Sequence, residues 1–395
     1  MRNVFVIFPK QGSYIGKKVV AIKVVIGNMK WLKRIMLAVV LLGLVNPLRV
    51  EAVKDISSDC GILMEQTTGR VLYEKCVDEQ MYVASITKIM TALIAIEHAS
   101  LDELVEILEE DLHQVGSSLY MVAGDEMVLI DLLYGLMLRS GNDAAWAIAR
   151  HVGEGDVSVF VEMMNEKAAE IGMENTWFQN PSGLDETTYN LSTAYDMALV
   201  QQYAMNNPIY REISGTAVHR SSSVGGRSFV WSNKHRLVRG RYEYTISGKT
   251  GYTEDARRTL VTSAYRDGVE LIVVTLRGGD DWNDHVTLFE YGFDRFDLRQ
   301  VTEVGQLDFI EVEIREMTGF DRLFVREERH VMVREDEEVK IHLVMDRNVP
   351  SEVVARLEII VDGEFVDGIS VYAMEEFTSD DMTWLQRVMS WLVRH

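Results

Sequence analysis

The stretch Ala84–Met90, which reads Ala-Ser-Ile-Thr-Lys-Ile-Met, constrains the fold of this chain more than any other segment. Apolar residues follow Ser85 at helical spacing, which predicts that a helix begins here and packs one face into a core. Ser85 and Lys88 are three residues apart, so on a helix they share a face, about one turn from each other. The amine of Lys88 would then lie within reach of the hydroxyl of Ser85.

This arrangement suits nucleophilic catalysis, because a serine hydroxyl attacks well only when a neighbouring base takes its proton. A lysine can be that base when burial or nearby cations keep it neutral. The first turn of a helix also directs free N–H groups outward, which suits a developing oxyanion. Taken alone, however, the Ser-x-x-Lys pattern is weak, because it usually belongs to a capped helix with a solvated lysine.

A second motif, Ser140-Gly141-Asn142, stands between two predicted helices, Glu126–Leu138 and Asp143–Val152. Small polar residues at such a place fit an ordinary turn and cap. In a cleft, the hydroxyl of Ser140 would instead relay a proton, and the amide of Asn142 would bridge Lys88 and a substrate carbonyl.

A third motif, Lys249-Thr250-Gly251, lies beside two apolar segments, Thr259–Ala264 and Val269–Leu276, which we expect to form neighbouring antiparallel strands. The lysine would supply positive charge, the threonine a hydroxyl, and the glycine would let a substrate approach the backbone. A surface strand that ends in a turn is the alternative.

Composition and charge narrow the class of protein. The chain has 395 residues, of which 47% are hydrophobic, so we expect a globular protein of about two or three domains. The net charge is −21, and the acidic excess lies after residue 52. An acidic body argues against a nucleic-acid partner, which would require a basic footprint.

The N-terminal region 1–52 predicts export. Met29–Arg34 is basic, and Ile35–Val45 is an apolar run that is short for a bilayer span. We therefore predict a signal peptide at 29–52, cleaved after Ala52, and a protein at the outer face of the cytoplasmic membrane or in the cell wall. An uncleaved anchor is the alternative, and the sequence leaves Met1 and Met29 open as the start.

The two cysteines belong to a predicted hairpin of strands Cys60–Glu65 and Arg70–Cys76. Export permits a disulfide between Cys60 and Cys76, and two reduced, packed thiols are the alternative. We find no metal-ligand spacing in the sequence.

The C-terminal part has a different pattern. Residues 299–376 read as short strands with turns, which predicts a small all-β, sandwich-like domain. Residues 377–395 contain an amphipathic helix, Asp380–His395, whose apolar face includes Trp384 and Trp391. This helix suggests attachment to a membrane surface, and docking on the protein's own β domain is the alternative.

The three motifs occur in an order that resembles the active-site serine penicillin-recognising enzymes. The chain is most similar to the low-molecular-mass penicillin-binding proteins that act as D-alanyl-D-alanine carboxypeptidases, the S11 peptidase family, and in particular to those of Gram-positive spore formers. The resemblance covers residues 55 to 297, and the further matching stretches are Thr68–Tyr73, Ala84–Ala92, Asn180–Leu184, Ser192–Ala198 and Lys249–Thr253.

The resemblance implies an α+β fold, with an antiparallel sheet and a helical subdomain in residues 53–298. It also implies removal of the terminal D-alanine from peptidoglycan stem peptides, with β-lactams as covalent inhibitors. Ser85 would be the nucleophile and Lys88 the general base. Ser140 would pass a proton to the leaving D-alanine, and Asn142 would orient Lys88 and the substrate.

The resemblance further implies that Lys249 keeps the cleft positive and lowers the pKa of Lys88. Thr250 would bind the substrate carboxylate, and Gly251 would let the substrate approach the strand. The N–H groups of Ser85 and Tyr252 would form the oxyanion hole. No metal or organic cofactor would take part.

Two stretches depart from the family's usual pattern. Ala256-Arg257-Arg258 stands where the family often has Ala-Gly, and Asn190-Leu191 replaces its usual His-Tyr. A secreted β-lactamase and a non-hydrolytic penicillin-binding sensor or wall-binding protein are the alternative functions.

Overall fold

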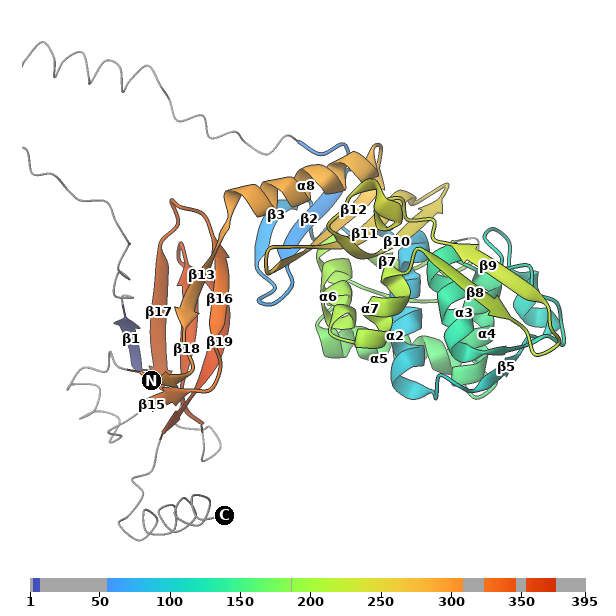
Figure 1. Cartoon of the computed structure of the whole chain (residues 1–395), viewed down its shortest axis with the longest axis horizontal. Coiled ribbons are helices and arrows are strands. Elements are labelled where there is room, and N and C mark those ends of the chain that lie inside the picture. The colour runs from blue at the N-terminus through green and yellow to red at the C-terminus, as the bar shows by residue number, and fades with distance from the viewer. Residues whose placement is uncertain (1–2, 8–54, 186, 308–322, 346–352, 374–395) are drawn as a thin grey trace, which may run out of the picture. The chain divides into compact units, whose positions relative to one another are not determined.

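The computed structural model describes residues 3–7, 55–185, 187–307, 323–345 and 353–373 (Figure 1). The predicted signal peptide at 29–52 and the predicted helix Asp380–His395 lie outside these residues, and both stay predictions. Within the described part of the chain, no helix is both long enough and apolar enough to cross a bilayer.

A five-stranded antiparallel sheet in the order β10-β11-β12-β2-β3 forms the centre of the larger domain. Helix α8 (Asp281–Arg295) covers one face of this sheet, and α6 (Ala194–Met205) and α7 (Pro208–Gly215) pack on the other (Figure 1). Its strands are β2 (Cys60–Glu65), β3 (Val71–Lys75), β10 (Thr245–Thr253), β11 (Arg257–Arg266) and β12 (Val269–Gly278). The predicted hairpin and the predicted antiparallel pair are both confirmed.

The Ser85 segment forms a short 3₁₀ turn, η1 (Ala84–Thr87), that runs into α2 (Lys88–His98). Helix α2 is buried from its first residue to Ala95, so it is a central helix of the core and not a surface helix. Around it lie α3 (Leu129–Tyr134), α4 (Asn142–Val152) and α5 (Val157–Ile171). The helical subdomain is therefore built around the helix that begins next to the serine.

One predicted helix start is wrong. Residues Glu126–Val128 form strand β6, which pairs with β5 (Leu104–Glu106), and helix α3 begins only at Leu129. Helix α8 begins at Asp281, although a run of apolar residues at helical spacing starts only at Leu288. Its first turn is polar because acidic side chains are favourable at a helix N-terminus, and they interrupt the apolar spacing.

The segment before β10 contains a hairpin of β8 (Val218–Ser222) and β9 (Ser228–Ser232). A π-helical turn, η4 (Leu237–Arg241), then leads toward β10. A similar turn, η3 (Gly135–Arg139), continues α3 and ends at the second motif.

The predicted all-β region after the catalytic domain is confirmed, with a separate apolar core. One sheet has the order β1-β17-β18-β19-β15-β14, and β13 pairs with β16. The strands are β1 (Asn3–Ile7), β13 (Asp297–Thr302), β14 (Gly305–Gln306), β15 (Leu323–Val325), β16 (Arg329–Val333), β17 (Val339–Met345), β18 (Val353–Val361) and β19 (Glu364–Ala373). The predicted strand Phe309–Ile314 lies outside the described residues.

Cys60 and Cys76 are free cysteines in this structure, the first buried and the second exposed. Their sulfur atoms and a carboxylate oxygen of Glu79 lie within 4.8 Å of one another. Burial, followed by the neighbouring Cys76, raises the pKa of the Cys60 thiol to about 12. This cluster contains none of the residues of the three motifs.

Candidate active site

Ser85 and Lys88 meet as their spacing predicts. The serine lies in the 3₁₀ turn and the lysine is the first residue of α2, which places Lys88 Nζ 3.0 Å from Ser85 Oγ. Lys88 is completely buried, whereas Ser85 is partly exposed and lines a cavity. The pair therefore presents a reachable hydroxyl beside a desolvated amine.

The surroundings of the Lys88 amine favour its neutral form. Burial, and then the charge of Lys234, lowers its pKa to about 7. Nζ lies 2.8 Å from Asn142 Oδ1 and 2.5 Å from the carbonyl oxygen of Ser182. A neutral amine has two N–H donors and one lone pair, so these two oxygens take the donors. The lone pair is then left for the hydroxyl of Ser85.

The carbonyl of Ser182 belongs to the loop Asn180–Gly183, which is docked tightly on the serine turn. Gly183 has φ +75°, and a Cβ there would lie 1.9 Å from the carbonyl oxygen of Ala84, so only glycine fits. Asn180 Oδ1 accepts hydrogen bonds from the backbone N–H groups of Ser182 at 3.0 Å and of Gly183 at 2.7 Å. The loop thus holds the Ser182 carbonyl against the base.

Asn190, one of the departures from the family pattern, supports this loop. Its buried amide nitrogen donates to Thr87 Oγ1 at 3.0 Å and to the carbonyl oxygen of Asn180 at 2.9 Å. Asn190 therefore ties the loop to the serine turn.

The second and third motifs meet on the other side of Ser85. Ser140 follows the π-helical turn in a left-handed conformation with φ +64°, and its Oγ lies 3.0 Å from Lys249 Nζ. Lys249 also donates to the carbonyl oxygen of Thr250 at 2.8 Å. Burial, and then the charges of Lys88 and Lys234, lowers the pKa of Lys249 well below its usual value.

A lysine outside the three motifs also acts on Lys88. After burial, the charge of Lys234 lowers the pKa of Lys88, and the repulsion between Lys88 and Lys249 lowers the pKa of Lys249. Lys234 Nζ donates to Ser117 Oγ at 2.7 Å, and the residue lines the cavities on both sides of Ser85. The sequence reasoning missed Lys234 because it stands in a loop without a motif.

Strand β10 lies directly against the serine turn, and Gly251 makes this approach possible. A Cβ at Gly251 would lie 2.3 Å from Thr259 Oγ1 and 3.0 Å from the backbone nitrogen of Ser85. Thr250 lines one cavity, and the side chain of Tyr252 stands 61% exposed at the rim. All eight residues predicted for the site are therefore brought together around Ser85.

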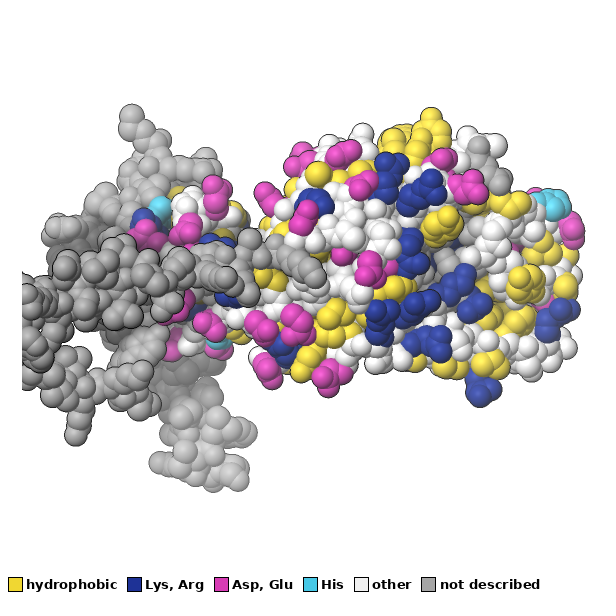
Figure 2. Space-filling model, turned by 90° about the horizontal axis from the view of Figure 1, so that it is seen from above, with side chains coloured by type: hydrophobic (Ala, Val, Ile, Leu, Met, Phe, Trp, Pro, Cys, Tyr) yellow, Lys and Arg dark blue, Asp and Glu magenta, His cyan; other side chains and the backbone are white. Residues whose placement is uncertain are grey.

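Two cavities flank Ser85. One, of about 380 Å³, is lined by Ser140, Thr250 and Arg258, and the other, of about 400 Å³, by Asn142 and Gly183. Figure 2 shows lysine and arginine side chains gathered in a band on the catalytic domain. A substrate can thus extend to both sides of the serine, in positively charged surroundings.

The departure at Ala256-Arg257-Arg258 falls at the end of the strand pair. Arg257 adopts φ +57°, a left-handed conformation that glycine would take without strain. Arg258 lies opposite Tyr252 on the neighbouring strand and reaches the cavity that contains Thr250. The departure therefore changes the lining of the cleft and leaves the three motifs in place.

The fold and the site define a protein with an accessible serine beside a buried lysine, at the start of a central helix and against an antiparallel sheet. The profile of the S11 peptidase family, described as D-alanyl-D-alanine carboxypeptidase, matches residues 47–279. The chain belongs to this family, and the predicted class, a serine-type D-Ala-D-Ala carboxypeptidase, is confirmed.

Individual relatives agree with this membership. D-alanyl-D-alanine carboxypeptidase DacF of Bacillus subtilis is 29% identical over 346 residues, which cover 83% of this chain and 88% of the relative. The crystal structure of a D-alanyl-D-alanine carboxypeptidase from Mycobacterium tuberculosis matches with a TM-score of 0.59 at 32% identity, covering 62% of this chain and 93% of that one. The Streptomyces K15 DD-transpeptidase matches with a TM-score of 0.58 at 30% identity, covering 62% and 99%.

Proposed function

We propose that this protein removes the terminal D-alanine from peptidoglycan pentapeptide stems through an acyl-enzyme on Ser85, and that penicillins inhibit it by acylating the same serine. The observation that supports this most directly is the geometry at Lys88. A buried amine with a pKa of about 7 lies 3.0 Å from the serine hydroxyl, with its other contacts made by neutral oxygens.

In the first step, Lys88 takes the proton of Ser85, and Oγ attacks the carbonyl carbon between the two D-alanines. The backbone N–H groups of Ser85 and Tyr252 stabilise the oxyanion. Ser140 passes the proton from Lys88 to the leaving nitrogen, the C–N bond breaks, and Lys88 is neutral again. D-alanine leaves with a new N–H, and the stem remains esterified to Ser85.

In the second step, water gives a proton to Lys88 and attacks the ester. The Oγ–acyl bond breaks, Ser85 regains its proton, and the shortened stem leaves as a carboxylic acid. A β-lactam would follow the same first step. Its leaving nitrogen stays tethered to the acyl group, so it remains in the cleft and obstructs the attack of water.

The substrate carboxylate fits the side of the cleft that contains Lys249 and Thr250. Lys88 and Lys249 are both buried, and a proton bound to one amine makes protonation of the other amine less favourable. A carboxylate beside Lys249 would raise the pKa of that lysine and let it hold a proton. Binding of the anion would thus charge Lys249 while Lys88 stays neutral as the base.

We also propose that the protein acts outside the cytoplasmic membrane. The substrate class supports this, because stem peptides belong to the cell wall, and the signal peptide predicted at 29–52 agrees. The test uses the full chain with an affinity tag at the C-terminus, expressed in a Gram-positive host. Protease added to intact protoplasts should digest the tagged protein, because the membrane protects only proteins that remain inside. Protection would contradict this part of the proposal.

The test of the activity is D-alanine release by the full chain from a peptide that ends in D-Ala-D-Ala, with Ser85→Ala as the matched control. Release that the control lacks is expected. No release, with a labelled penicillin stably bound to Ser85, would contradict the proposal and favour a sensor. Rapid penicillin hydrolysis without D-alanine release would favour a β-lactamase instead.

A further inference from the structure

The cavity that contains Ser140 and Thr250 has further lining residues that the proposed mechanism does not use. Among them are Arg236, Arg258 and Trp282, which we call the arginine–tryptophan wall. The cavity has a volume of about 380 Å³, much more room than a single alanine residue fills. The structure therefore offers space and charge that the leaving D-alanine alone does not use.

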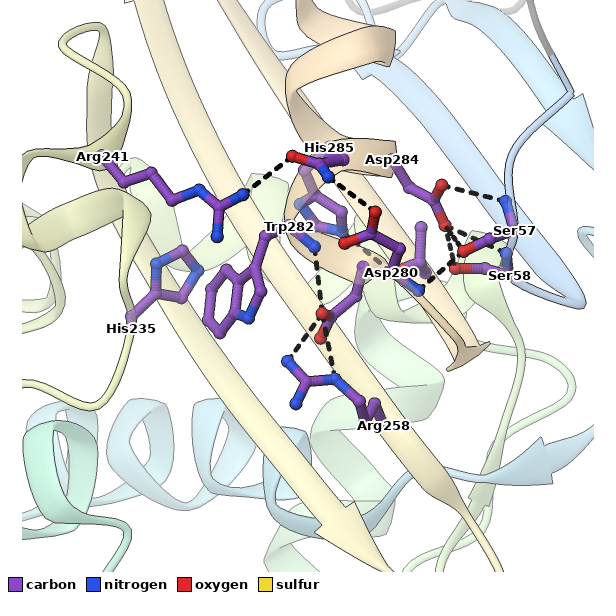
Figure 3. Close-up of polar contacts among 12 residues, drawn as sticks. Ser57, Ser58, His235, Arg241, Arg258, Asp280, Trp282, Asp284 and His285 are labelled. Atoms are coloured by element: carbon purple, nitrogen blue, oxygen red, sulfur yellow. Dashed lines mark hydrogen bonds and ion pairs between the residues drawn. The ribbon is translucent and has the colours of Figure 1, made fainter.

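Asp281, the first residue of α8, binds two residues of the wall. Asp281 Oδ1 accepts hydrogen bonds from Arg258 Nε at 3.0 Å and Nη2 at 2.7 Å, and from the backbone N–H of Trp282 at 2.9 Å. The ring of His235 packs edge-on against the indole, with centroids 5.2 Å apart (Figure 3). Trp282 is only 7% exposed. The indole is thus fixed from several sides before any ligand arrives.

Both arginines of the wall lie over this indole. The guanidinium carbon of Arg258 is 5.5 Å from the ring centroid, and that of Arg236 is 5.9 Å away. The carboxylate of Asp281 balances the charge of Arg258. Among the described residues, Arg236 has no ion pair with any carboxylate, and the side-chain amine of Lys234 donates only to the neutral hydroxyl of Ser117. The cavity therefore has an excess of positive charge.

The wall lies on the leaving-group side of Ser85. Ser140 and Thr250, the proposed proton relay and carboxylate contact, line this cavity, whereas Asn142 and Gly183 line the one opposite. A leaving residue whose α-carboxylate is bound at Thr250 would direct its side chain into the remaining space. A second carboxylate on that side chain would meet Arg236.

We propose that Arg236 binds a second carboxylate on the leaving residue, so that the enzyme also hydrolyses D-alanyl bonds to the amine of a dicarboxylic amino acid. This inference rests on the proposed function of the Ser85 site. The chemistry is the same: the Oγ–acyl bond forms, the C–N bond breaks, the dicarboxylic residue leaves with the proton from Ser140, and water releases the acyl group.

The test compares three acyl-D-alanyl peptides that end in D-alanine, D-glutamate or D-glutamine. D-glutamine has the shape of D-glutamate without its charge, so the ratio of their kcat/KM values isolates the second carboxylate. In the wild-type full chain we expect this ratio to exceed about tenfold in favour of D-glutamate, because an unpaired arginine lies in a partly enclosed cavity. The ratio should fall to within about twofold in Arg236→Gln and be largely retained in Arg236→Lys.

Arg241→Gln is the matched control. Arg241 belongs to the same loop region and donates to Asn283 Oδ1 at 2.8 Å, but it does not line the cavity, so its loss should leave the ratio unchanged. A wild-type ratio near one would overturn the inference, as would a high ratio that persists in Arg236→Gln. Hydrolysis of the D-alanine peptide would continue in both cases, whereas failure to hydrolyse any of the three would overturn the proposed function as well.

Discussion

Asn142 contacts the Lys88 amine with a neutral oxygen: Oδ1 lies 2.8 Å from Nζ, while its amide nitrogen donates to the carbonyl oxygen of Val115 at 2.7 Å. A carboxylate in this place would also position the amine, but its charge would favour the protonated form. The amide of Asn142 therefore positions the Lys88 amine without raising its pKa. The strength of the base is therefore set by burial and by Lys234.

The first prediction concerns the pH dependence of acylation. Lys88 must be neutral to take the proton of Ser85, and its pKa is lowered to about 7, so it is protonated and inactive below this value. The kcat/KM for acylation by a chromogenic β-lactam should therefore rise with pH, reach half its plateau near pH 7, and fall about tenfold per unit well below it. A rate that is flat from about pH 5 to 8 would contradict the assignment of Lys88 as the base.

The second prediction concerns Asn142→Asp. The new carboxylate would stabilise protonated Lys88 and raise its pKa, so the acid limb of the profile should move to higher pH. At neutral pH the acylation rate should fall by about tenfold or more, and it should recover in part at alkaline pH. Asn142→Ala serves as the control, because it removes the contact without adding charge. An equal alkaline shift in both variants would show that charge is not the cause.

The sequence predicted those site residues whose side chains carry the proposed functional groups. Ser85, Lys88, Ser140 and Lys249 carry the hydroxyls and amines that the chemistry needs, and they meet as predicted. Ser182 was not identified, because it contacts the base through its main-chain carbonyl, and a carbonyl has no residue-type signature. Its position depends instead on the fold of the loop around it.

Lys234 shows a second limit. It follows strand β9 and precedes the turn η4, where neither helical nor strand periodicity marks a residue as buried or exposed. Only the pairing of distant segments brings it beside Ser117 and near Lys88. Apolar spacing does not mark the start of α8 for a related reason, since Asp281 and Asp284 look like surface residues although both are buried by specific partners.

The third prediction concerns Gly251→Ala. The added methyl group would lie 2.3 Å from Thr259 Oγ1 and 3.0 Å from the backbone nitrogen of Ser85, so β10 must move away from the serine turn. Because both proposed oxyanion donors lie at this junction, we expect acylation to slow by about 10²-fold, as with loss of an oxyanion contact. The measurement is the rate of acylation by penicillin at a pH on the plateau of the pH–rate profile.

A control for this prediction is Gly124→Ala, since a Cβ at Gly124 would meet no atom within 4 Å and its strain from a positive φ is remote from the cleft. Its acylation rate should stay near that of the wild type. An unchanged rate in Gly251→Ala would mean that the close approach of β10 to Ser85 is not needed for acylation.

The last prediction concerns stability and Asp284 of α8. Its carboxylate accepts hydrogen bonds from the backbone N–H groups of Ser57 at 2.9 Å and Ser58 at 3.0 Å, and from their hydroxyls at 2.8 and 2.6 Å (Figure 3). These bonds fasten the segment that enters β2 to the helix that covers the sheet. Asp284→Ala would leave the buried donors of Ser58 without an acceptor, so the free energy of unfolding should fall by about 2–3 kcal/mol.

The matched control is Ser57→Ala, because Ser57 is exposed and loses only one hydroxyl, so the expected loss is about 1 kcal/mol or less. The measurement is urea denaturation of the full chain with binding of labelled penicillin as the readout. This readout reports on the catalytic domain alone. In the absence of urea, Asp284→Ala should still bind penicillin, since the carboxylate of Asp284 bonds to Ser57 and Ser58, and neither serine lines the cavities at Ser85. Equal midpoints for the two variants would show that the carboxylate contributes little beyond the Ser57 hydroxyl contact.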